Sequence, residues 1–231
     1  MINITNLQKK YANQVVVNIP ELSLPTNTII CIVGNNGAGK TTFLKLMLDL
    51  VLPSSGCIEA FGNKIHETEK WKNDIACFLD ESFLIDFLTT EEYFDFILKI
   101  NEINVDEYKV KLKRFNLFFN EEILHKKKYI RSFSTGNKHK IGIAGALLKN
   151  SKLVLLDEPF ANLDPSGQIQ LKKIIRDINR SEGTGFLISS HNLEHVVEIS
   201  DRVILLESGK IIKDITTEKN TLQELKDYFS A

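Results

Sequence analysis

One glycine-rich run decides the fold of this chain: Gly34-Asn35-Asn36-Gly37-Ala38-Gly39-Lys40-Thr41-Thr42. It matches the pattern G-x-x-x-x-G-K-[ST]. The β-branched apolar run 28–33 before it predicts a buried strand, and apolar residues at helical spacing over 41–48 predict a helix. A strand, a glycine loop and a helix in this order form an anion site. The glycines let successive backbone N–H groups turn toward one point, and the helix N-terminus adds positive potential.

This arrangement predicts a phosphate-binding loop of the Walker A type, and hence a site for a nucleoside triphosphate such as ATP. Lys40 is expected to reach the β- and γ-phosphates, and the hydroxyl of Thr41 to hold Mg²⁺. All residues of the run are candidates for contact with the nucleotide: Gly34, Asn35, Asn36, Gly37, Ala38, Gly39, Lys40, Thr41 and Thr42. The loop by itself does not indicate what the energy is used for.

The composition fits one large domain, or one domain with a subdomain. The chain has 231 residues, of which 43% are hydrophobic, and this is ample for a core. Its 29 basic and 30 acidic residues nearly cancel, so the net charge does not indicate a nucleic acid or an acidic membrane face as partner. The basic cluster at 126–128, with Arg131, is interpreted as a solvated turn.

The cysteines and the lack of long apolar runs favour a cytosolic protein. Cys31, Cys57 and Cys77 are odd in number, show no metal-ligand spacing and lie in or beside apolar stretches, so we expect reduced, buried thiols. Residues 1–4 lack the basic and long apolar regions of a signal peptide. No run approaches the ~20 apolar residues that a spanning helix needs. If the protein works at a membrane, we expect another chain to supply the membrane part.

Hydrophobic periodicity and turn residues divide the chain into strands and helices. Strands are expected at 2–7, 15–19, 28–33, 57–61, 75–79, 153–156, 185–189, 202–206 and 210–213, the first two and the last two as hairpins. Helices are expected at 41–48, 90–101, 106–118, 136–149, 166–180, 192–199 and 221–229.

The stretch from Phe78 to Phe119 has a different character, because it holds eight of the 14 phenylalanines and two helical patterns. Thr89 followed by Glu92 predicts a capping box at the start of the first helix. We expect a helical subdomain over approximately 80–150, inserted into the α/β core. Its aromatic residues are expected to form mostly its own core, and the sequence leaves open whether the remainder provides a docking surface.

The pattern as a whole predicts an α/β fold in a single domain, 1–231. We expect a P-loop NTPase core with a mainly parallel sheet and right-handed crossovers, an N-terminal antiparallel β region and the inserted helical subdomain.

A second group of functional residues follows the apolar strand 153–156. Asp157 and Glu158 emerge at its C-terminal end, where ligands bind in open α/β sheets. Asp157 is expected to meet Mg²⁺ through water. Glu158 is expected to act as the general base that polarises the attacking water.

With these residues in view, nearly the whole chain resembles the nucleotide-binding subunit of an ATP-binding-cassette (ABC) transporter. Phe133-Ser134-Thr135-Gly136-Asn137 stands where that family usually has the signature Leu-Ser-Gly-Gly-Gln. Ala161-Asn162-Leu163-Asp164 matches the family's D-loop, and His191 matches its switch histidine. Tyr11 falls where the family places an aromatic residue that stacks on adenine.

The resemblance assigns roles to these positions. Glu158 and His191 would be catalytic, and a head-to-tail dimer would place each ATP between the phosphate loop of one copy and the signature loop of the other. The residues that would add to the nucleotide site are Tyr11, Ser134, Thr135, Gly136, Asn137 and Asp164. Gly136 also opens a predicted helix, whose free N–H groups could receive phosphate. The sequence therefore predicts a second anion site, and two anion sites suit a C₂ pair, either a homodimer or a heterodimer with a second ATPase subunit.

The chain departs from the family pattern at several positions. Thr135 replaces a glycine and Asn137 replaces glutamine, although Ser134 and Gly136 remain. The Q-loop glutamine that usually follows the strand at 75–79 falls here on Asp80 or Glu81. Asp80 is the candidate metal ligand of the two.

The resemblance implies an ATPase subunit that energises a separate integral membrane permease. It would sit in the cytoplasm, at the inner face of the membrane. A signature of the form Ser-x-Gly-x-Lys-x-Lys is similar to that of exporter subunits, so export is the expected direction. The alternative is a soluble ABC-type ATPase that acts in assembly or regulation without a permease. Neither a coiled-coil heptad run nor a second cassette is present. No nucleic-acid partner is expected, and the sequence does not identify a transported substrate.

Overall fold

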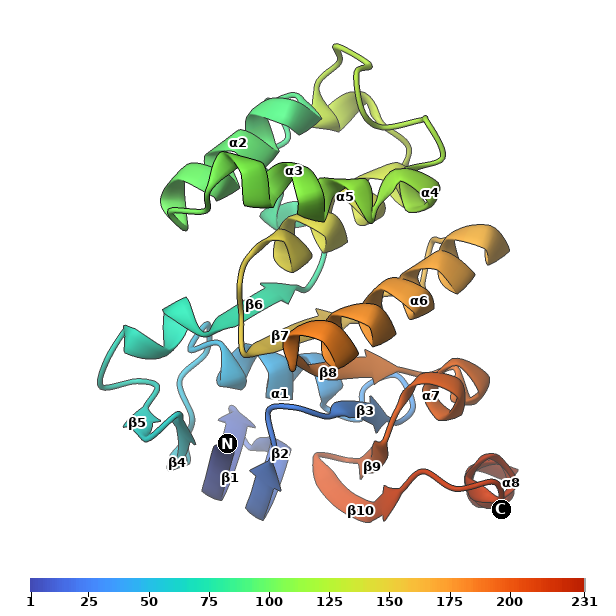
Figure 1. The fold of residues 1–231 in the computed structure, drawn as a ribbon. Helices are drawn as coiled ribbons and strands as arrows, with labels where there is room; N and C mark the ends of the chain where they lie inside the picture. Colours follow the sequence, from blue (N-terminus) through green and yellow to red (C-terminus); the bar gives the residue numbers. More distant parts are fainter. Residues whose placement is uncertain (231) are drawn as a thin grey trace.

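The computed structural model describes residues 1–230 as two β-sheets with helices around them (Figure 1). The larger sheet has six strands in the order β10-β9-β3-β8-β7-β6, and the smaller has four in the order β2-β1-β4-β5. The strands are β1 (Ile2–Tyr11), β2 (Gln14–Leu24), β3 (Ile29–Val33), β4 (Ser55–Ala60), β5 (Asn63–Lys64), β6 (Ile75–Phe78), β7 (Leu153–Asp157), β8 (Gly185–Ser190), β9 (Arg202–Glu207) and β10 (Lys210–Thr216).

Eight α-helices and three short 3₁₀-helices complete the part of the chain that the structure describes. The α-helices are α1 (Lys40–Met47), α2 (Thr90–Ile100), α3 (Val105–Lys113), α4 (Asn116–Phe119), α5 (Thr135–Leu148), α6 (Pro165–Glu182), α7 (Leu193–Ile199) and α8 (Thr221–Ser230). The 3₁₀-helices are η1 (Lys70–Asn73), η2 (Glu81–Phe83) and η3 (Ile130–Ser132). Among these elements, no helix is long and apolar enough to cross a membrane.

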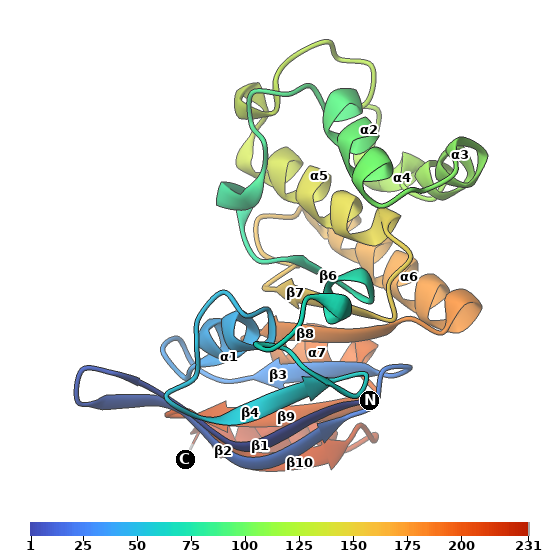
Figure 2. The same ribbon diagram turned by 90° about the vertical axis from the view of Figure 1, so that its left-hand side faces the viewer.

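The larger sheet is parallel except at the antiparallel pair β9–β10. Every residue of β3 is buried, because the two faces of the sheet are covered by different layers. Ile29, Cys31 and Val33 pack toward residues of α5, α6 and α7, whereas Ile30 and Ile32 pack toward α1 and the smaller sheet. Figure 2 shows α1 between the two sheets. The expected fold class is therefore confirmed, including the doubly covered parallel sheet.

The smaller sheet is antiparallel, and β1 and β2 form the predicted hairpin. Both strands extend beyond the predicted bounds of 2–7 and 15–19. The added residues near the turn include Lys9, Lys10 and Gln14, which lack the alternation that marks a half-buried strand. They belong to the ladder through backbone pairing, which requires no apolar side chain.

The helical region between β6 and β7 lies above the sheets in Figure 1. The capping box at Thr89 and Glu92 is confirmed. The single helix expected at 106–118 is wrong, because the chain forms α3 and α4 instead. The N–H groups of Arg114 and Phe115 bond three residues back, to the carbonyls of Lys111 and Leu112, and this tightens the backbone and ends the helix.

The break directs aromatic residues into a core within the helical region. Four phenylalanines of this region are almost fully buried: Phe94, Phe115, Phe118 and Phe119. The ring centroid of Phe119 lies 5.7–6.1 Å from the ring centroids of the other three. Most of the phenylalanines of this region therefore form its own core, as expected, while Phe83, Phe87 and Phe96 are exposed.

One expectation about the cysteines is wrong. Cys31 is buried, but Cys57 is half-buried and Cys77 is exposed. β6 is an edge strand, and Cys77 lies on the face opposite to Ala76 and Phe78, which join the core. Burial raises the pKa of the Cys31 thiol to about 12, so this thiol stays protonated and unreactive.

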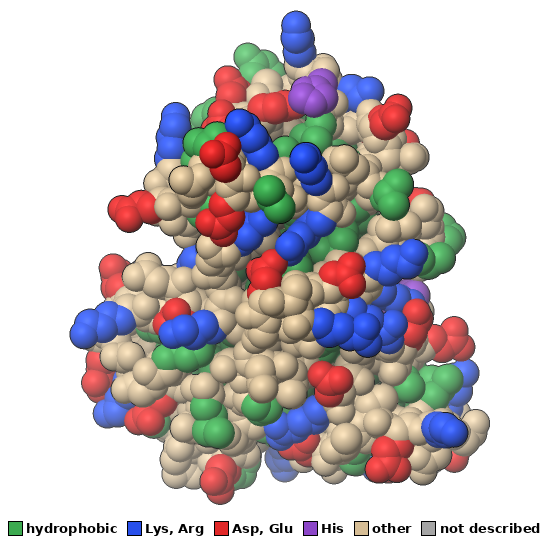
Figure 3. All heavy atoms as spheres, viewed as in Figure 1, with side chains coloured by type: hydrophobic (Ala, Val, Ile, Leu, Met, Phe, Trp, Pro, Cys, Tyr) green, Lys and Arg blue, Asp and Glu red, His purple; other side chains and the backbone are tan. Residues whose placement is uncertain are grey.

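Charged side chains of both signs are scattered over the face shown in Figure 3. This distribution agrees with the near balance of 29 basic and 30 acidic residues.

Phe119→Ala should lower the free energy of unfolding by about 3–5 kcal/mol, because it leaves a cavity among buried rings. Denaturant-induced unfolding measures this. Leu117→Ala is a control on the same helix, since Leu117 is 73% exposed, and it should change the free energy of unfolding by less than about 0.5 kcal/mol. Equal effects of the two variants would contradict the assigned core.

Candidate functional site

The glycine-rich loop joins β3 to α1 and surrounds a hollow of ≈ 230 Å³. Gly37 and Gly39 have φ values of 84° and 104°, in the left-handed region that favours glycine. Gly39 is the N-cap of α1, and no side chain caps this end of the helix. The first N–H groups of α1 are therefore free to bind an anion. The hollow is lined by Val16, Asn36, Gly37, Ala38, Gly39, Lys40, Thr41, Thr42 and Glu158.

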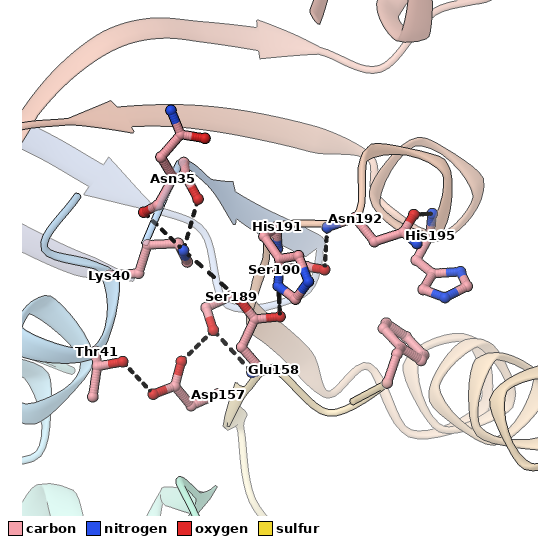
Figure 4. A network of polar contacts seen from close by, with 12 residues as sticks. Asn35, Lys40, Thr41, Asp157, Glu158, Ser189, Ser190, His191, Asn192 and His195 are labelled. Carbon is pink, nitrogen blue, oxygen red and sulfur yellow. Dashed lines mark hydrogen bonds and ion pairs between the residues drawn. The ribbon is translucent and has the colours of Figure 1, made fainter. Parts of the chain in front are cut away.

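Lys40 is buried and folds back across the loop (Figure 4). Its Nζ donates to the carbonyls of Gly34 at 2.7 Å and Asn35 at 3.3 Å, and it lies 3.7 Å from Oε1 of Glu158. These partners hold the ammonium group beside the hollow, and a phosphate oxygen would be a stronger, charged acceptor than a carbonyl.

Thr41 and Asp157 meet although they are 116 positions apart in the sequence. The Thr41 hydroxyl donates to Oδ2 of Asp157 at 2.6 Å, and the Ser189 hydroxyl donates to Oδ1. Asp157 and Ser189 are register partners at the ends of the parallel strands β7 and β8. The result is a cluster of hydroxyl and carboxylate oxygens in which Asp157 and Ser189 are buried and Thr41 is exposed. Oxygens of this type are the ligands that Mg²⁺ takes.

Glu158 leaves the end of β7 with a φ of 46°, which is left-handed and unusual for a non-glycine residue. Its N–H donates to the carbonyl and hydroxyl of Ser189, at 3.2 and 2.9 Å. Its Oε2 lies 2.9 Å from Nδ1 of His191, which follows β8. The carboxylate of Glu158 therefore lies at the hollow, between Lys40 and His191, as Figure 4 shows.

Ser189 is a site residue that the sequence analysis missed. It accepts from the N–H of Glu158 and donates to the carboxylate of Asp157, so one hydroxyl positions both acidic residues. The available signal was its place at the C-terminal end of a predicted strand, next to His191. That signal has meaning only once β8 is known to pair with β7.

The signature residues form a separate helix N-terminus. Ser134 is the N-cap of α5 and accepts from the N–H of Asn137 at 3.3 Å. The side chain of Asn137 donates to Glu122, and a Cβ on Gly136 would lie 2.7 Å from the carbonyl of Asn162. None of these signature residues lines the hollow of the phosphate loop.

Asp164 and Tyr11 also lie outside the lining of that hollow. Asp164 caps α6, accepting from the N–H of Gly167 at 3.3 Å, and lies 3.4 Å from Nζ of Lys140. Desolvation opposes ionisation, but Lys140 and that N–H outweigh it and keep the pKa of Asp164 below its ordinary value. Tyr11 is 48% exposed at the tip of the β1–β2 hairpin, with Nζ of Lys9 4.9 Å from its ring centroid.

The two Q-loop candidates are both engaged within the chain. Oδ1 of Asp80 accepts from the N–H of Ser82 at 2.7 Å and caps η2. Oε1 of Glu81 lies 3.0 Å from Nδ1 of His139 on α5. A metal role for Asp80 remains a prediction. Within residues 1–230, no group of three or more His, Cys, Asp or Glu residues is arranged to hold a metal ion.

Comparison with known proteins agrees with this geometry. The model of the ABC transporter family matches residues 17–161. The chain belongs to the ABC transporter family. Its relatives include the lantibiotic transport ATP-binding protein SrtF of Streptococcus pyogenes, which is 30% identical over 100% of this chain and 96% of the relative. The lipopolysaccharide export system ATP-binding protein LptB of Haemophilus influenzae is 32% identical over 93% of this chain and 90% of the relative. The bacitracin transport ATP-binding protein BcrA of Enterococcus faecalis is 29% identical over 93% of this chain and 69% of the relative.

Solved structures show the same fold. The ATP-binding subunit of an ABC transporter superposes with a TM-score of 0.85 at 25% identity, covering 100% of this chain and 93% of that one. The ATP-binding cassette MJ0796, solved as a dimer bound to ADP and Pi, superposes with a TM-score of 0.82 at 20% identity. The superposition covers 94% of this chain and 99% of that one. This ABC subunit binds and hydrolyses ATP.

Lys40→Ala should weaken ATP binding about 10–100-fold, because it removes a charge-assisted contact to phosphate of about 1.5–3 kcal/mol. Titration with a fluorescent ATP analogue measures the dissociation constant. Lys45→Ala is a control on the same helix, because Lys45 does not line the hollow. Unchanged affinity in Lys40→Ala would refute the role given to this lysine.

Ser189→Ala should slow ATP hydrolysis by about tenfold, since it removes a hydrogen bond to a charged group that orients both acidic residues. The dissociation constant for ATP should change less than the turnover rate, because Ser189 does not line the hollow. Ser151→Ala is the matched control, since Ser151 is also buried but its hydroxyl has no partner in the described residues. A turnover rate in Ser189→Ala equal to that of the control would count against the assignment.

Proposed function

We propose that this ABC subunit energises a separate integral membrane permease, most simply for export, through ATP-driven head-to-tail pairing of two ATPase subunits. One observation carries the proposal. At the phosphate loop, Lys40 and Thr41 lie beside Asp157 and Glu158, and Glu158 contacts His191. Residues 134–137 form a second helix N-terminus, which does not line the hollow of the phosphate loop. In a head-to-tail pair, residues 134–137 of one copy would face the phosphate loop of the other, so that both anion sites contact the same nucleotide.

The chain's own residues fit Mg²⁺ at Thr41 and Asp157. Their oxygens are 2.6 Å apart, Asp157 is buried and Thr41 is exposed. With the cation bound, the Thr41 hydroxyl would turn a lone pair toward it and would no longer donate its proton to Asp157. A cation held by these two residues would supply positive charge that stabilises the charge developing on the phosphate oxygens. Asp80 would be an additional ligand only if its carboxylate gave up the hydrogen bond that it accepts from the N–H of Ser82.

In this proposal, Lys40 exchanges its bonds to Gly34 and Asn35 for the phosphates. Glu158 accepts a proton from the attacking water, and His191 holds the Glu158 carboxylate at the distance now seen, 2.9 Å. Ser134, Thr135, Gly136 and Asn137 of the second copy would contact the γ-phosphate through the N-terminus of α5. Asp164 would lie near the same interface, and Tyr11 would stack on adenine.

ATP binds the closed pair better than the open one under this scheme, and hydrolysis removes that preference. A difference in affinity between two states is what lets a ligand drive a conformational change. The pair is either a homodimer or a heterodimer with a second ATPase subunit. The subunit would then be peripheral, on the cytoplasmic face of the membrane.

Export is the function named for the lipopolysaccharide relative, and the lantibiotic and bacitracin relatives are named for transport without a direction. One further relative belongs to a tungstate uptake system, so the preference for export rests mainly on the signature residues. Phe83 and Phe87, just after β6, are 53% and 62% exposed and would supply apolar area for a permease segment.

Purification of the subunit from native membranes tests the permease. An integral membrane protein should purify with it in stoichiometric amount. A chain found only with soluble partners would favour the alternative, a soluble ABC-type ATPase in assembly or regulation.

Glu158→Gln should keep ATP affinity, slow hydrolysis by about 10²–10⁴-fold and leave an ATP-bound dimer, because only the general base is lost. Light scattering at saturating ATP and Mg²⁺ measures the mass. Lys40→Ala/Glu158→Gln is the control, which should stay monomeric because it lacks the phosphate contact. A monomeric Glu158→Gln protein under these conditions would argue against ATP-driven pairing.

A further inference from the structure

His139 is a buried ionisable residue that the proposed catalysis does not use. It lies on α5, is 4% exposed, and its Nδ1 is 3.0 Å from Oε1 of Glu81. Its ring also packs edge-on against Phe78, with centroids 4.9 Å apart and an interplanar angle of 86°. Phe78 ends β6 and Glu81 begins η2, so one side chain of α5 contacts the chain on both sides of Asp80.

The hydrogen-bonding partners define the state of this imidazole ring. A carboxylate only accepts hydrogen bonds, so Nδ1 carries the proton that bonds to Glu81. Nε2 is buried and has no partner in the described residues. A proton on Nε2 would be a buried donor without an acceptor, at a cost of about 1–3 kcal/mol. Nδ1 is therefore the ring nitrogen that donates to Glu81, and the bond is directional.

Gly142 brings the same face of α5 into closer contact with β6. It follows His139 by three positions, so both residues lie on one face of the helix. A Cβ at Gly142 would lie 2.0 Å from Cε2 of Phe78, a distance no side chain tolerates. Backbone and aromatic ring therefore touch directly at this point, and His139 and Gly142 together fix α5 on the end of β6.

The consequence reaches the signature loop, because Ser134 caps the same helix. Ser134 precedes His139 by five positions, or about 7.5 Å along the helix axis. We propose that Glu81 and His139 are a positioning pair that orients residues 134–137, and that Glu81 is not a metal ligand. The inference rests on the proposed function in one respect, namely that residues 134–137 contact ATP held by a second copy.

Glu81→Ala and His139→Ala, made in the full chain, should each lower the turnover of ATP by about 5–10-fold. The dissociation constant for ATP should stay within about twofold, because neither residue lines the phosphate-loop hollow. The double variant should be no slower than the slower single variant, since both remove one interaction. His139→Asn carries an N–H near the position of Nδ1 and should restore turnover to within about twofold of the starting protein.

Mn²⁺ binding separates positioning from ligation. In the Glu158→Gln background with ATP bound, Glu81→Gln keeps an acceptor oxygen for His139 but loses the charge. It should therefore leave Mn²⁺ affinity within about twofold, as measured by electron paramagnetic resonance. A tenfold or larger loss would make Glu81 a metal ligand and overturn the proposal. Failure of His139→Asn to recover turnover would overturn the positioning role.

His125→Ala is the matched control. In another histidine–glutamate pair of the helical region, Nδ1 of His125 lies 3.7 Å from Oε1 of Glu91. The side chain of His125 is 89% exposed. Its loss should leave turnover unchanged, and a loss as large as in His139→Ala would make the effect nonspecific and contradict the proposal. Normal turnover in His139→Ala, with a normal Glu158→Gln dimer, would refute this inference alone. Absence of the Glu158→Gln dimer would instead refute the proposed pairing.

Discussion

The parallel pairing of β3, β8 and β7 is the constraint on which the site depends. β8 pairs with β3 on one side and with β7 on the other, so the carboxyl ends of all three strands meet at one edge of the sheet. The phosphate loop follows β3, Asp157 ends β7, and His191 follows β8. Because strand register is fixed by burial on both faces, a slip of one residue would move these groups to the wrong face as well as out of reach.

Hydrogen bonds turn this shared edge into a defined geometry. Ser189 links Asp157 to the backbone of Glu158, Thr41 bonds the other oxygen of Asp157, and His191 holds Glu158. The bonds from Ser189 and His191 hold both acidic residues in place before ATP binds, whereas Thr41 and Lys40 would change partners when it does. The left-handed backbone at Glu158 is part of the same arrangement, since an ordinary strand conformation would not turn the chain there.

The helical region adds a second level of organisation. Its own aromatic core holds α2, α3 and α4 together, while α5 returns to the sheet and is fixed at β6 by Phe78, Glu81, His139 and Gly142. The N-terminus of α5 is thus oriented by contacts with the segment that follows the edge strand of the sheet. The exposed side chains of Phe83 and Phe87 lie in the same segment after β6 as Glu81.

Local patterns in the sequence determined the phosphate loop, the acidic strand end, the order of strands and helices and the fold class. These features rest on glycine conformations, apolar periodicity and helix capping, all of which act over a few neighbouring residues. Tertiary structure alone decided the role of Ser189, the exposure of Cys77 and the bond between Glu81 and His139. Each of these depends on which distant element packs alongside, and that choice is made by burial and strand pairing across the whole chain, so no short stretch of sequence contains it.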